Sequence, residues 1–446
     1  MPQSGSEGRN KQFYAPIKLL PQVRSVGSIA SLYLFRMLGL FMVLPVLVLY
    51  GQDYRGSTPL LLGIALGAYG FSQALLQIPF GWWSDRWGRR PVIALGLVLF
   101  ALGSLVAAVS DSVYGLICGR FIQGAGAIAS ALMALVADST EEQHRSKAMA
   151  FIGVSIGLSF SIALILGPVI AELAGLSGIF WLNILLALAG LLVLFTAIPA
   201  ASPDPTSSGV NAASIKEVLQ HKELLRLDWG ILVLHLVLMA NFVAIPGLLE
   251  SVVELDRADH WRVYLSMLVA AFVVMIPIML LGERRGKLKP IFLGAISALA
   301  VVESLLAVAG SHAGIILVCL FTFFVAFNLL EVSLPSQVSK MAPNNARGTA
   351  SGVYSSSQFF GAFAGGTLGG AALSVGGATA VFALNTLVLV VWLIVAWPMV
   401  ISRRIRVQPA PLFEPECYGD EDYSDQTKAS ETKIGKLSAK VELESV

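Results

Sequence analysis

The sequence predicts an all-α integral membrane protein in which twelve transmembrane helices form two pseudo-symmetric six-helix halves. Three observations lead to this prediction. Hydrophobic residues make up 56% of the 446-residue chain and charged residues only 13%, with a mean hydropathy of +0.76, whereas about 25% of the residues of an ordinary soluble protein are charged. Twelve apolar segments are long enough to cross a bilayer, and short sequence matches recur about 200 residues apart.

The apolar segments are identified by length, because a bilayer core of about 30 Å requires about 20 residues of α-helix. Several of them contain Gly or Pro, which membrane helices tolerate better than soluble ones. The expected spans are 28–50, 59–83, 91–110, 113–138, 148–172, 178–200, 228–250, 261–282, 290–309, 313–340, 347–373 and 377–400.

Three segments lie outside the spans. Residues 1–27 are polar and lack the apolar core and cleavage site of a signal peptide, so the first span is expected to act as an uncleaved insertion signal. Residues 201–227 link the halves and end in KEVLQHKELLRL, which predicts a short amphipathic helix at the membrane surface. Residues 401–446 contain prolines and an acidic run but no periodic apolar pattern, so they are predicted to form a disordered tail.

An internal repeat predicts the two halves, 28–200 and 228–400. FMVLP at 41–45 recurs as FVAIP at 242–246, an offset of 201 residues. The loop GWWSDRWGRRP, which starts at Gly81, has a degenerate counterpart, GERRGKLKP, which starts at Gly282, again 201 residues later. Parallel halves of this kind are a recurring transporter design.

The distribution of Lys and Arg predicts the orientation. If both termini lie on one side, that side holds 25 of the 30 basic residues and the opposite side holds only Arg55, Arg257 and Arg262. The positive-inside rule then places both termini, the arm and the tail in the cytoplasm.

Five ionisable residues are embedded in apolar segments: Arg36, Arg120, His235, Glu303 and Glu331. Ionisable groups are costly in hydrocarbon, so they usually face a polar cavity or one another and mark ion or substrate pathways. This pattern indicates a protein that moves a solute across a membrane.

Other protein classes lack support in the sequence. No Ser/His, paired-Asp or metal-ligand set is recognisable, so neither enzymatic activity nor a cofactor nor a bound metal is expected. The cysteines Cys118, Cys319 and Cys417 are far apart and are interpreted as small apolar packing residues. The basic residues are scattered over short loops, which gives no indication of nucleic-acid binding.

Three motifs resemble those of a known family. With twelve spans in two halves, the loop GWWSDRWGRR from Gly81 resembles the major facilitator superfamily, and the resemblance covers residues 28–400. RFIQGAGA, which contains Arg120, Gln123 and Gly124, and GLSFSIALILGP at 157–168 resemble its drug:proton antiporter branch. The combined motifs are most similar to bacterial YajR-type transporters. The resemblance implies a multi-pass protein of the bacterial inner membrane that works as a monomer.

The resemblance also assigns roles to the loop. It implies that Asp85 engages the start of the eleventh span, near 347–349, and holds the halves together in the outward-facing state. Asp138 is a further candidate partner in this charge cluster. Gly81 and Gly88 are expected to allow close helix approach and a tight turn. The arginines of the loop are explained equally well by a gate or by positive-inside topology; they are Arg86, Arg89 and Arg90.

Small residues at a spacing of four predict a smooth helix face on the fifth and eleventh spans. This face is interpreted either as ordinary helix packing or as a sliding seam between the halves, and the Gly167–Pro168 pair is expected to add a bend. The residues are Gly153, Gly157 and Ser161 in one span and Gly361, Gly365 and Gly369 in the other.

In the family fold the first, fourth, seventh and tenth spans line the central cavity, which implies that Arg36, Arg120, His235 and Glu331 face it. Arginine can neutralise an anion but does not release its proton, so Glu331 is the candidate proton carrier, with His235 as a second titratable site or a packing residue. Glu303 is expected to be interfacial or structural. Polar and aromatic cavity candidates are Gln73, Gln77, Gln123, Asn241, Asn328, Gln358, Phe41, Tyr69, Phe71, Phe242, Phe327 and Tyr354.

The function that follows is a proton-coupled secondary transporter that exports a small hydrophobic or amphipathic compound by alternating access. A proton symporter or a facilitator for a polar metabolite is the alternative. The expected partners are the small-molecule substrate, protons and the lipid bilayer.

Overall fold

The computed structural model describes residues 19–140, 142–198, 212–309, 311–343 and 346–400. Within these ranges the secondary structure is helical, apart from an isolated bridge between Arg55 and Ser112, and short turns and loops connect the helices. The chain divides into two units, Met1–Arg403 and Arg404–Val446. The predicted disordered tail lies outside the described residues, as do most of the N-terminal arm and the first part of the linker.

The first six spans, which we call the N-terminal bundle, are formed by α1 to α7. Two predicted spans are broken in the structure. Val26–Met42 and Leu47–Asp53 form a pair bent by 48° around Pro45, and the 113–138 span is divided at 126–128. The helices are α1 (Leu19–Met42), α2 (Leu47–Tyr50), α3 (Pro59–Trp87), α4 (Arg89–Val109), α5 (Val113–Ala125), α6 (Ala129–Asp138) and α7 (Glu142–Ala197).

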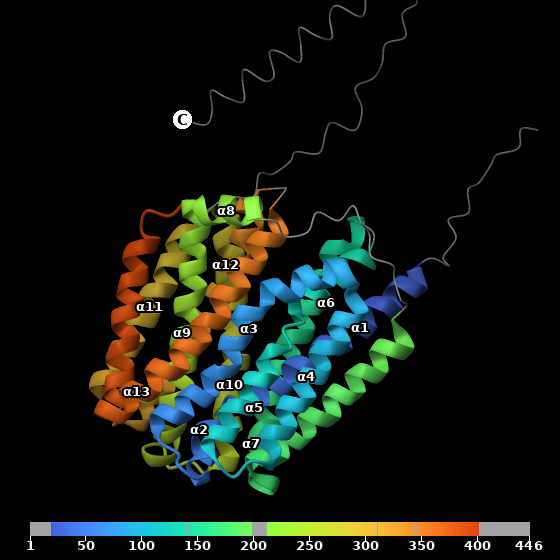
Figure 1. Cartoon of the computed structure of the whole chain (residues 1–446). Coiled ribbons are helices and arrows are strands. Elements are labelled where there is room, and N and C mark those ends of the chain that lie inside the picture. The colour runs from blue at the N-terminus through green and yellow to red at the C-terminus, as the bar shows by residue number, and fades with distance from the viewer. Residues whose placement is uncertain (1–18, 141, 199–211, 310, 344–345, 401–446) are drawn as a thin grey trace, which may run out of the picture. The chain divides into compact units, whose positions relative to one another are not determined.

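The remaining spans, which we call the C-terminal bundle, are formed by α9 to α13 (Figure 1). They follow a short helix, α8, which covers only the first part of the predicted amphipathic helix KEVLQHKELLRL, because the segment from Lys222 onward belongs to α9. The helices are α8 (Ala212–Gln220), α9 (Lys222–Ser251), α10 (His260–Arg284), α11 (Leu288–Ala309), α12 (Ala313–Met341) and α13 (Arg347–Ala396).

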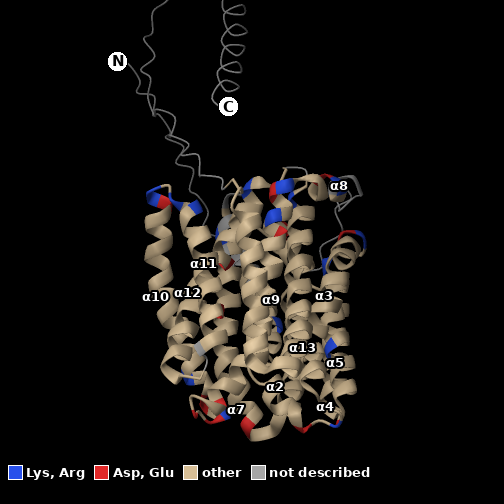
Figure 2. Cartoon of the chain, turned by 90° about the vertical axis from the view of Figure 1, so that its left-hand side faces the viewer, with Lys and Arg blue, Asp and Glu red and all other residues tan. Residues whose placement is uncertain are grey.

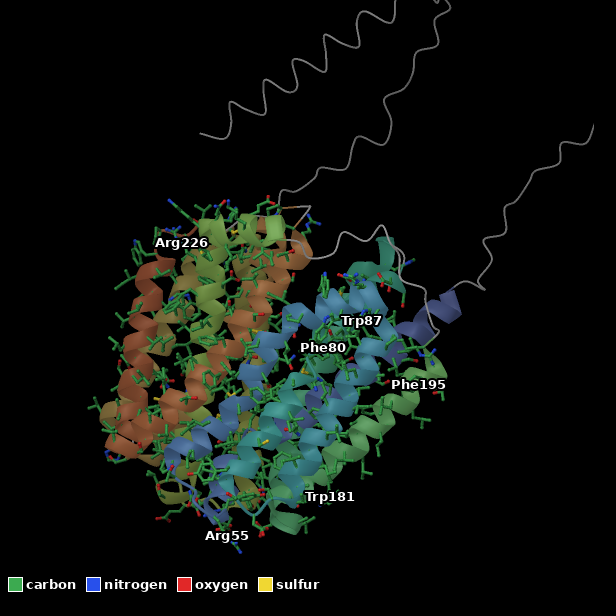
Figure 3. The ribbon with its side chains drawn as sticks, in the orientation of Figure 1. Arg55, Phe80, Trp87, Trp181, Phe195 and Arg226 are labelled. Carbon is green, nitrogen blue, oxygen red and sulfur yellow. The ribbon has the colours of Figure 1, made fainter. Side chains whose placement is uncertain are left out.

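The helix lengths account for twelve spans. The described chain contains nine helices that are long and apolar enough to cross a membrane, or ten with the bent pair. Two of these, in α7 and α13, are 51 and 50 residues long and correspond to about 75 Å, more than twice what one crossing requires. Each contains a glycine with positive φ, Gly175 at 66° and Gly377 at 65°, at the predicted boundary between two spans. Figure 3 shows the return, with Trp181 near the bottom of the view and Phe195 on the same helix farther up. The predicted membrane class and span number are confirmed.

Charged residues lie mainly at the two ends of the bundles (Figure 2). Lys and Arg gather at the end where α8 lies, which we call the α8 end. Arg55, in the α2–α3 connection, lies at the opposite end, whereas Arg226 lies at the α8 end (Figure 3). The structure therefore keeps the charge asymmetry on which the predicted orientation rests.

The two bundles meet along α3 and α13, where glycines allow their backbones to touch. A Cβ atom added at Gly63 would lie 2.1 Å from the backbone oxygen of Gly366, and one added at Gly370 would lie 2.6 Å from that of Pro59. Small residues permit such close helix contact in membranes. These contacts involve the first turns of α3, so the bundles are joined tightly at the end opposite α8.

The predicted seam glycines pack differently. Cβ atoms at Gly361 and Gly365 would each lie 2.1 Å from a backbone oxygen of α9, so these residues serve packing within the C-terminal bundle. A Cβ atom added at Gly153 or at Gly157 would meet no other part of the structure within 4 Å. Gly167 approaches the backbone of Met42 in α1, and α7 continues as a helix through Pro168.

Candidate functional site

Two buried arginines of the N-terminal bundle lie close to one tyrosine ring. Arg36 from α1 is 2% exposed, and Arg120 from α5 is fully buried. Their guanidinium carbons lie 5.6 and 4.9 Å from the centroid of the Tyr69 ring, on α3. Three helices thus bring together two of the four residues that the family resemblance placed at the central cavity.

Glutamines of the same bundle accept hydrogen bonds from some of the nitrogen atoms of the two arginines. Arg36 Nη2 donates to Gln73 Oε1 at 2.9 Å, and Gln73 Nε2 donates to Gln77 Oε1 at 3.1 Å. Arg120 Nη1 donates to Gln123 Oε1 at 2.9 Å, and Gln123 Nε2 donates to Ser104 Oγ at 2.7 Å. Both series of hydrogen bonds contain predicted cavity residues, and these bonds orient the guanidinium groups.

The arginines are incompletely paired. Arg36 Nη1 and the Nε and Nη2 atoms of Arg120 are buried without a hydrogen-bond partner in the described chain. No carboxylate of the described residues forms an ion pair with either side chain. A desolvated cation–π contact contributes about 2 kcal/mol, whereas burial of an ion costs several kcal/mol. The ring contacts therefore do not offset the burial of two charges.

The motif residues of the fourth span have a packing role as well. A Cβ atom at Gly124 would lie 2.1 Å from the backbone oxygen of Tyr69. The absence of a side chain at Gly124 lets α5 approach α3 closely and places Arg120 against the Tyr69 ring. The motif thus combines a charged residue, the glutamine that orients it and the glycine that sets its position.

A second polar cluster lies in the C-terminal bundle and joins three helices. Gln358 Nε2, from α13, lies 2.8 Å from His235 Nε2 of α9 and 3.3 Å from Glu331 Oε1 of α12. His235 Nδ1 and Glu331 Oε2 are 3.9 Å apart. Three residues predicted to face the cavity are therefore brought together, and the Glu331 side chain remains 34% exposed. The cationic partner nearest to this carboxyl group in the described chain is a histidine, which can itself lose its charge.

Glu303 belongs to a separate, fully buried network. Asn241 Nδ2 donates to Glu303 Oε1 at 2.7 Å, and Asn385 Nδ2 donates to Glu303 Oε2 and to Asn241 Oδ1, each at 3.1 Å. Glu303 is 0% exposed, which excludes the interfacial alternative and supports the structural one. Asn241, a predicted cavity residue, is occupied in this network.

We expect Asn385→Leu to destabilise the protein, because it leaves acceptors on Glu303 and Asn241 buried without a donor. Each such loss costs about 1–3 kcal/mol. Thermal unfolding of the purified protein should show a clearly lowered midpoint. Asn328→Leu is the control, since Asn328 donates only to the carbonyl of Phe324 in its own helix. Equal shifts for both variants would contradict the proposed network.

The charged residues of the GWWSDRWGRR loop form a cluster at the α8 end. Arg89 bonds to Asp85 and donates from Nε to Asp138 Oδ2 at 2.9 Å, and Arg90 donates to the backbone oxygen of Phe195 at 2.8 Å. Arg86 lies over the Trp82 ring, and Gly88 has a φ of 94°, as the tight turn requires. Asp85 and Asp138 are thus brought together, whereas the described residues show no bond between Asp85 and the first turn of α13.

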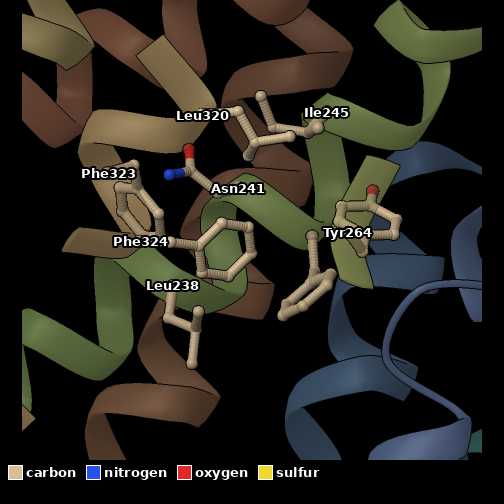
Figure 4. Close-up of a pocket in the computed structure, with 8 residues that line it drawn as sticks. Leu238, Asn241, Ile245, Tyr264, Leu320, Phe323 and Phe324 are labelled. Atoms are coloured by element: carbon tan, nitrogen blue, oxygen red, sulfur yellow. The ribbon is translucent and has the colours of Figure 1, made fainter. Parts of the chain in front are cut away.

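The other cavity candidates have mixed placements. Phe41 packs edge-on against Phe160, and Phe71 packs against Phe363 of α13. The hydroxyl of Tyr354 is buried and has no hydrogen-bond partner in the described chain. Phe242 and Asn241 line a small apolar pocket between α9, α10 and α12, together with Leu238, Ile245, Tyr264, Leu320, Phe323 and Phe324 (Figure 4). This pocket contains none of the predicted charged residues.

Asp228 was missed by sequence reasoning. It lies on α9 two turns before His235, is only 6% exposed, and its Oδ2 accepts no hydrogen bond from the described residues. The sequence placed Asp228 at the first residue of a predicted span, where a charge is ordinarily solvated. α9 begins at Lys222, which puts Asp228 inside the helix; the signal was its seven-residue spacing from His235.

Comparisons with known proteins agree with this architecture. A family model described as Major Facilitator Superfamily matches residues 29–366. The Inner membrane transport protein YajR of Escherichia coli (strain K12) is 44% identical over 391 residues, which cover 86% of each chain. Multidrug resistance protein 2 of Bacillus subtilis (strain 168) is 29% identical over 350 residues, covering 75% of this chain and 84% of that protein.

A solved structure is similar at the level of the fold. The crystal structure of the human organic anion transporter MFSD10 (TETRAN) has a TM-score of 0.63 and 21% sequence identity, and the match covers 84% of this chain and 99% of that one. The arrangement of helices is therefore shared beyond the range of close sequence similarity.

Proposed function

The chain belongs to the major facilitator superfamily, and from this we propose that it is a proton-coupled exporter of a small hydrophobic or amphipathic compound. It is a multi-pass membrane transporter and not an enzyme. Proton coupling, the direction of transport and a monomeric state are the parts that we propose. In this proposal the bundles 28–200 and 228–400 rock against each other in the bacterial inner membrane.

The observation that carries proton coupling is the Glu331 cluster. Glu331 is an ionisable residue within a membrane-spanning helix, and ionisable residues there mark proton and substrate pathways. It is partly accessible and lies 3.9 Å from a histidine rather than beside a lysine or arginine. A carboxyl group without a permanent positive partner can exchange its proton as its surroundings change between states.

Export is supported by the motifs of the fourth and fifth spans and by the similarity to a protein named for multidrug resistance. The basic residues at the α8 end support a cytoplasmic location for that end, and with it for both termini. The tight contacts of α3 and α13 lie at the opposite end. Together these features correspond to a transporter closed toward the outside and turned toward the cytoplasm.

Proteoliposomes with an imposed pH gradient test this function. When the lumen is acidic, adding a transported compound outside should raise the internal pH, because the compound enters in exchange for protons. A symporter would instead accumulate the compound when the outside is acidic, and a facilitator would show no dependence on the gradient. A panel of hydrophobic, amphipathic and polar compounds distinguishes these outcomes.

We also propose that Asp85 meets the first turn of α13 when the α8 end closes. In the present state Asp85 bonds to Arg89, which keeps the carboxylate at the membrane edge and available for a second arrangement. The positive end of the α13 dipole favours an anion there.

Asp85→Asn is expected to reduce transport strongly while the protein still folds, because the side-chain shape is kept and the charge is lost. Transport should be measured at matched expression in proteoliposomes. Asp111→Asn, at an exposed position in the α4–α5 connection, is the control. Cysteines introduced at Asp85 and Gly348 should crosslink in the outward-facing state; near-normal transport by Asp85→Asn and no crosslink in any state would together refute the gate.

A further inference from the structure

We infer that Arg36 and Arg120 bind the carboxylate of an amphipathic, monoanionic cargo molecule. This inference deepens the proposed function, on which it rests, by naming the chemical class of the cargo. The juxtaposition that carries it is two buried guanidinium groups that both lie near the Tyr69 ring, without a carboxylate partner in the described chain.

The unpaired donors specify an anion. Three guanidinium nitrogens are buried and lack an acceptor: Arg36 Nη1, Arg120 Nε and Arg120 Nη2. Nε and one Nη of a single arginine form the planar fork that matches a carboxylate with two parallel hydrogen bonds. On Arg120 only Nη1 has a partner, Gln123. The fork formed by Nε and Nη2 therefore remains available.

The protein itself offers no nearby acid in the N-terminal bundle. Its described aspartates and glutamates lie in connections or helix ends, apart from Glu172 of α7, which accepts a hydrogen bond from Tyr50. Glu331 of the C-terminal bundle is engaged with Gln358 and faces His235. The counter-charge for the arginines is thus assigned to a molecule that enters from outside the chain.

The surroundings of the arginines indicate an apolar body attached to that carboxylate. The Phe100 ring lies 4.9 Å from the Arg36 guanidinium carbon. Tyr69 packs against Phe359 of α13 at 6.5 Å, and Phe41 adds a further aromatic ring to this cluster. If the acid group of a cargo molecule binds the arginines, the rest of that molecule would therefore contact aromatic side chains that extend to the C-terminal bundle.

The same contact links the arginines to the Glu331 cluster. Phe359 touches Tyr69, while its neighbour Gln358 bonds to Glu331 and His235. A cargo molecule that occupies the arginines and displaces Phe359 would disturb the hydrogen bond to Glu331. Cargo binding and protonation are connected through two adjacent residues of one helix.

Isothermal titration of the purified full-length protein in detergent tests the inference with matched pairs of probes. The probes are octanoate, 4-phenylbutyrate and 1-naphthoate, each compared with its neutral primary amide. We expect at least one acid to bind about tenfold or more tightly than its amide, as charged hydrogen bonds of this kind provide. Wild-type protein that prefers no acid over its amide in any pair overturns the inference.

Arginine variants test whether the preference for the acid arises at Arg36 and Arg120. Arg36→Gln and Arg120→Gln, singly and together, should remove the preference for the acid, and Arg36→Lys should retain part of it. Arg262→Gln is the control, because this side chain, in the first turn of α10, is 65% exposed. A full acid preference in the folded double variant would also overturn the inference.

The titration is separable from the test of proton coupling, because it uses no gradient and no vesicle. If wild-type protein prefers the acids in the titration but shows no proton-driven transport in proteoliposomes, the proposed coupling alone is refuted. Proton-driven transport of the neutral amides, at the same rate as the acids, would refute the anionic cargo alone.

Discussion

Glu331→Gln is expected to abolish transport against a gradient while it preserves exchange of cargo down a gradient. Glutamine has a similar volume and resembles a permanently protonated glutamate, so the bundles can still rock. The proton can no longer be released, and the two fluxes are therefore uncoupled. The loss should reach the detection limit of the assay for uphill transport, because no remaining step would use the pH gradient.

The decisive measurement is proton release when cargo is added to weakly buffered purified protein. Wild-type protein should release protons, Glu331→Gln should not, and Glu254→Gln, an exposed loop variant, should behave as wild type. His235→Gln should shift the pH dependence and keep part of the coupling, since His235 is a neighbour of the carrier. Full release by Glu331→Gln would assign the proton to another group, of which His235, Asp228 and Asp85 are the candidates.

The second large effect is expected for Gly366→Ala. A Cβ atom at this position would lie 2.5 Å from the backbone oxygen of Gly63 and 3.0 Å from the nitrogen of Gly67, and backbone atoms cannot move aside as a flexible side chain can. Overpacking costs about 1–3 kcal/mol, which changes the population of a state by about fivefold to 150-fold. The variant should therefore depopulate the state in which α3 and α13 touch, and transport should fall accordingly.

Gly352→Ala provides a matched control on the same helix. Its added Cβ atom would meet only the side chain of Ile78, at 3.8 Å, which is an ordinary contact. Accessibility of a cysteine introduced at Leu60 should rise in Gly366→Ala and remain unchanged in Gly352→Ala. Equal transport by both variants would show that the close contact of α3 and α13 is not required in the cycle.

The sequence alone predicted the membrane class, the spans and the motif positions. A bilayer demands long apolar helices, and this requirement is visible in one dimension as a length and a composition. The merged helices α7 and α13 have breaks where the sequence placed span boundaries, at Gly175 and Gly377. Arg36, Arg120, His235 and Glu331 could be selected as candidates because charge is rare in such segments.

The pairing of side chains could not be predicted, because it depends on which helix faces meet. No sequence pattern indicated that Asn385 would join Glu303 and Asn241, since the three residues lie on three helices far apart in the chain. Helix packing likewise decided that Gly361 and Gly365 contact α9 while Gly366 and Gly370 contact α3. One residue corresponds to a rotation of about 100° around a helix, so adjacent glycines serve different interfaces.

Asp228 shows the same division between sequence and structure. The predicted span began at this residue, but α9 begins six residues earlier, at Lys222, and Asp228 is buried. The sequence by itself determined which residues would be costly to bury, because that cost belongs to each side chain in hydrocarbon. Only the tertiary structure decided which of them are compensated, as Glu303 is by two asparagines, and which remain unpaired, as the arginines beside Tyr69 do, because compensation requires donors and acceptors from different helices to lie within hydrogen-bond distance.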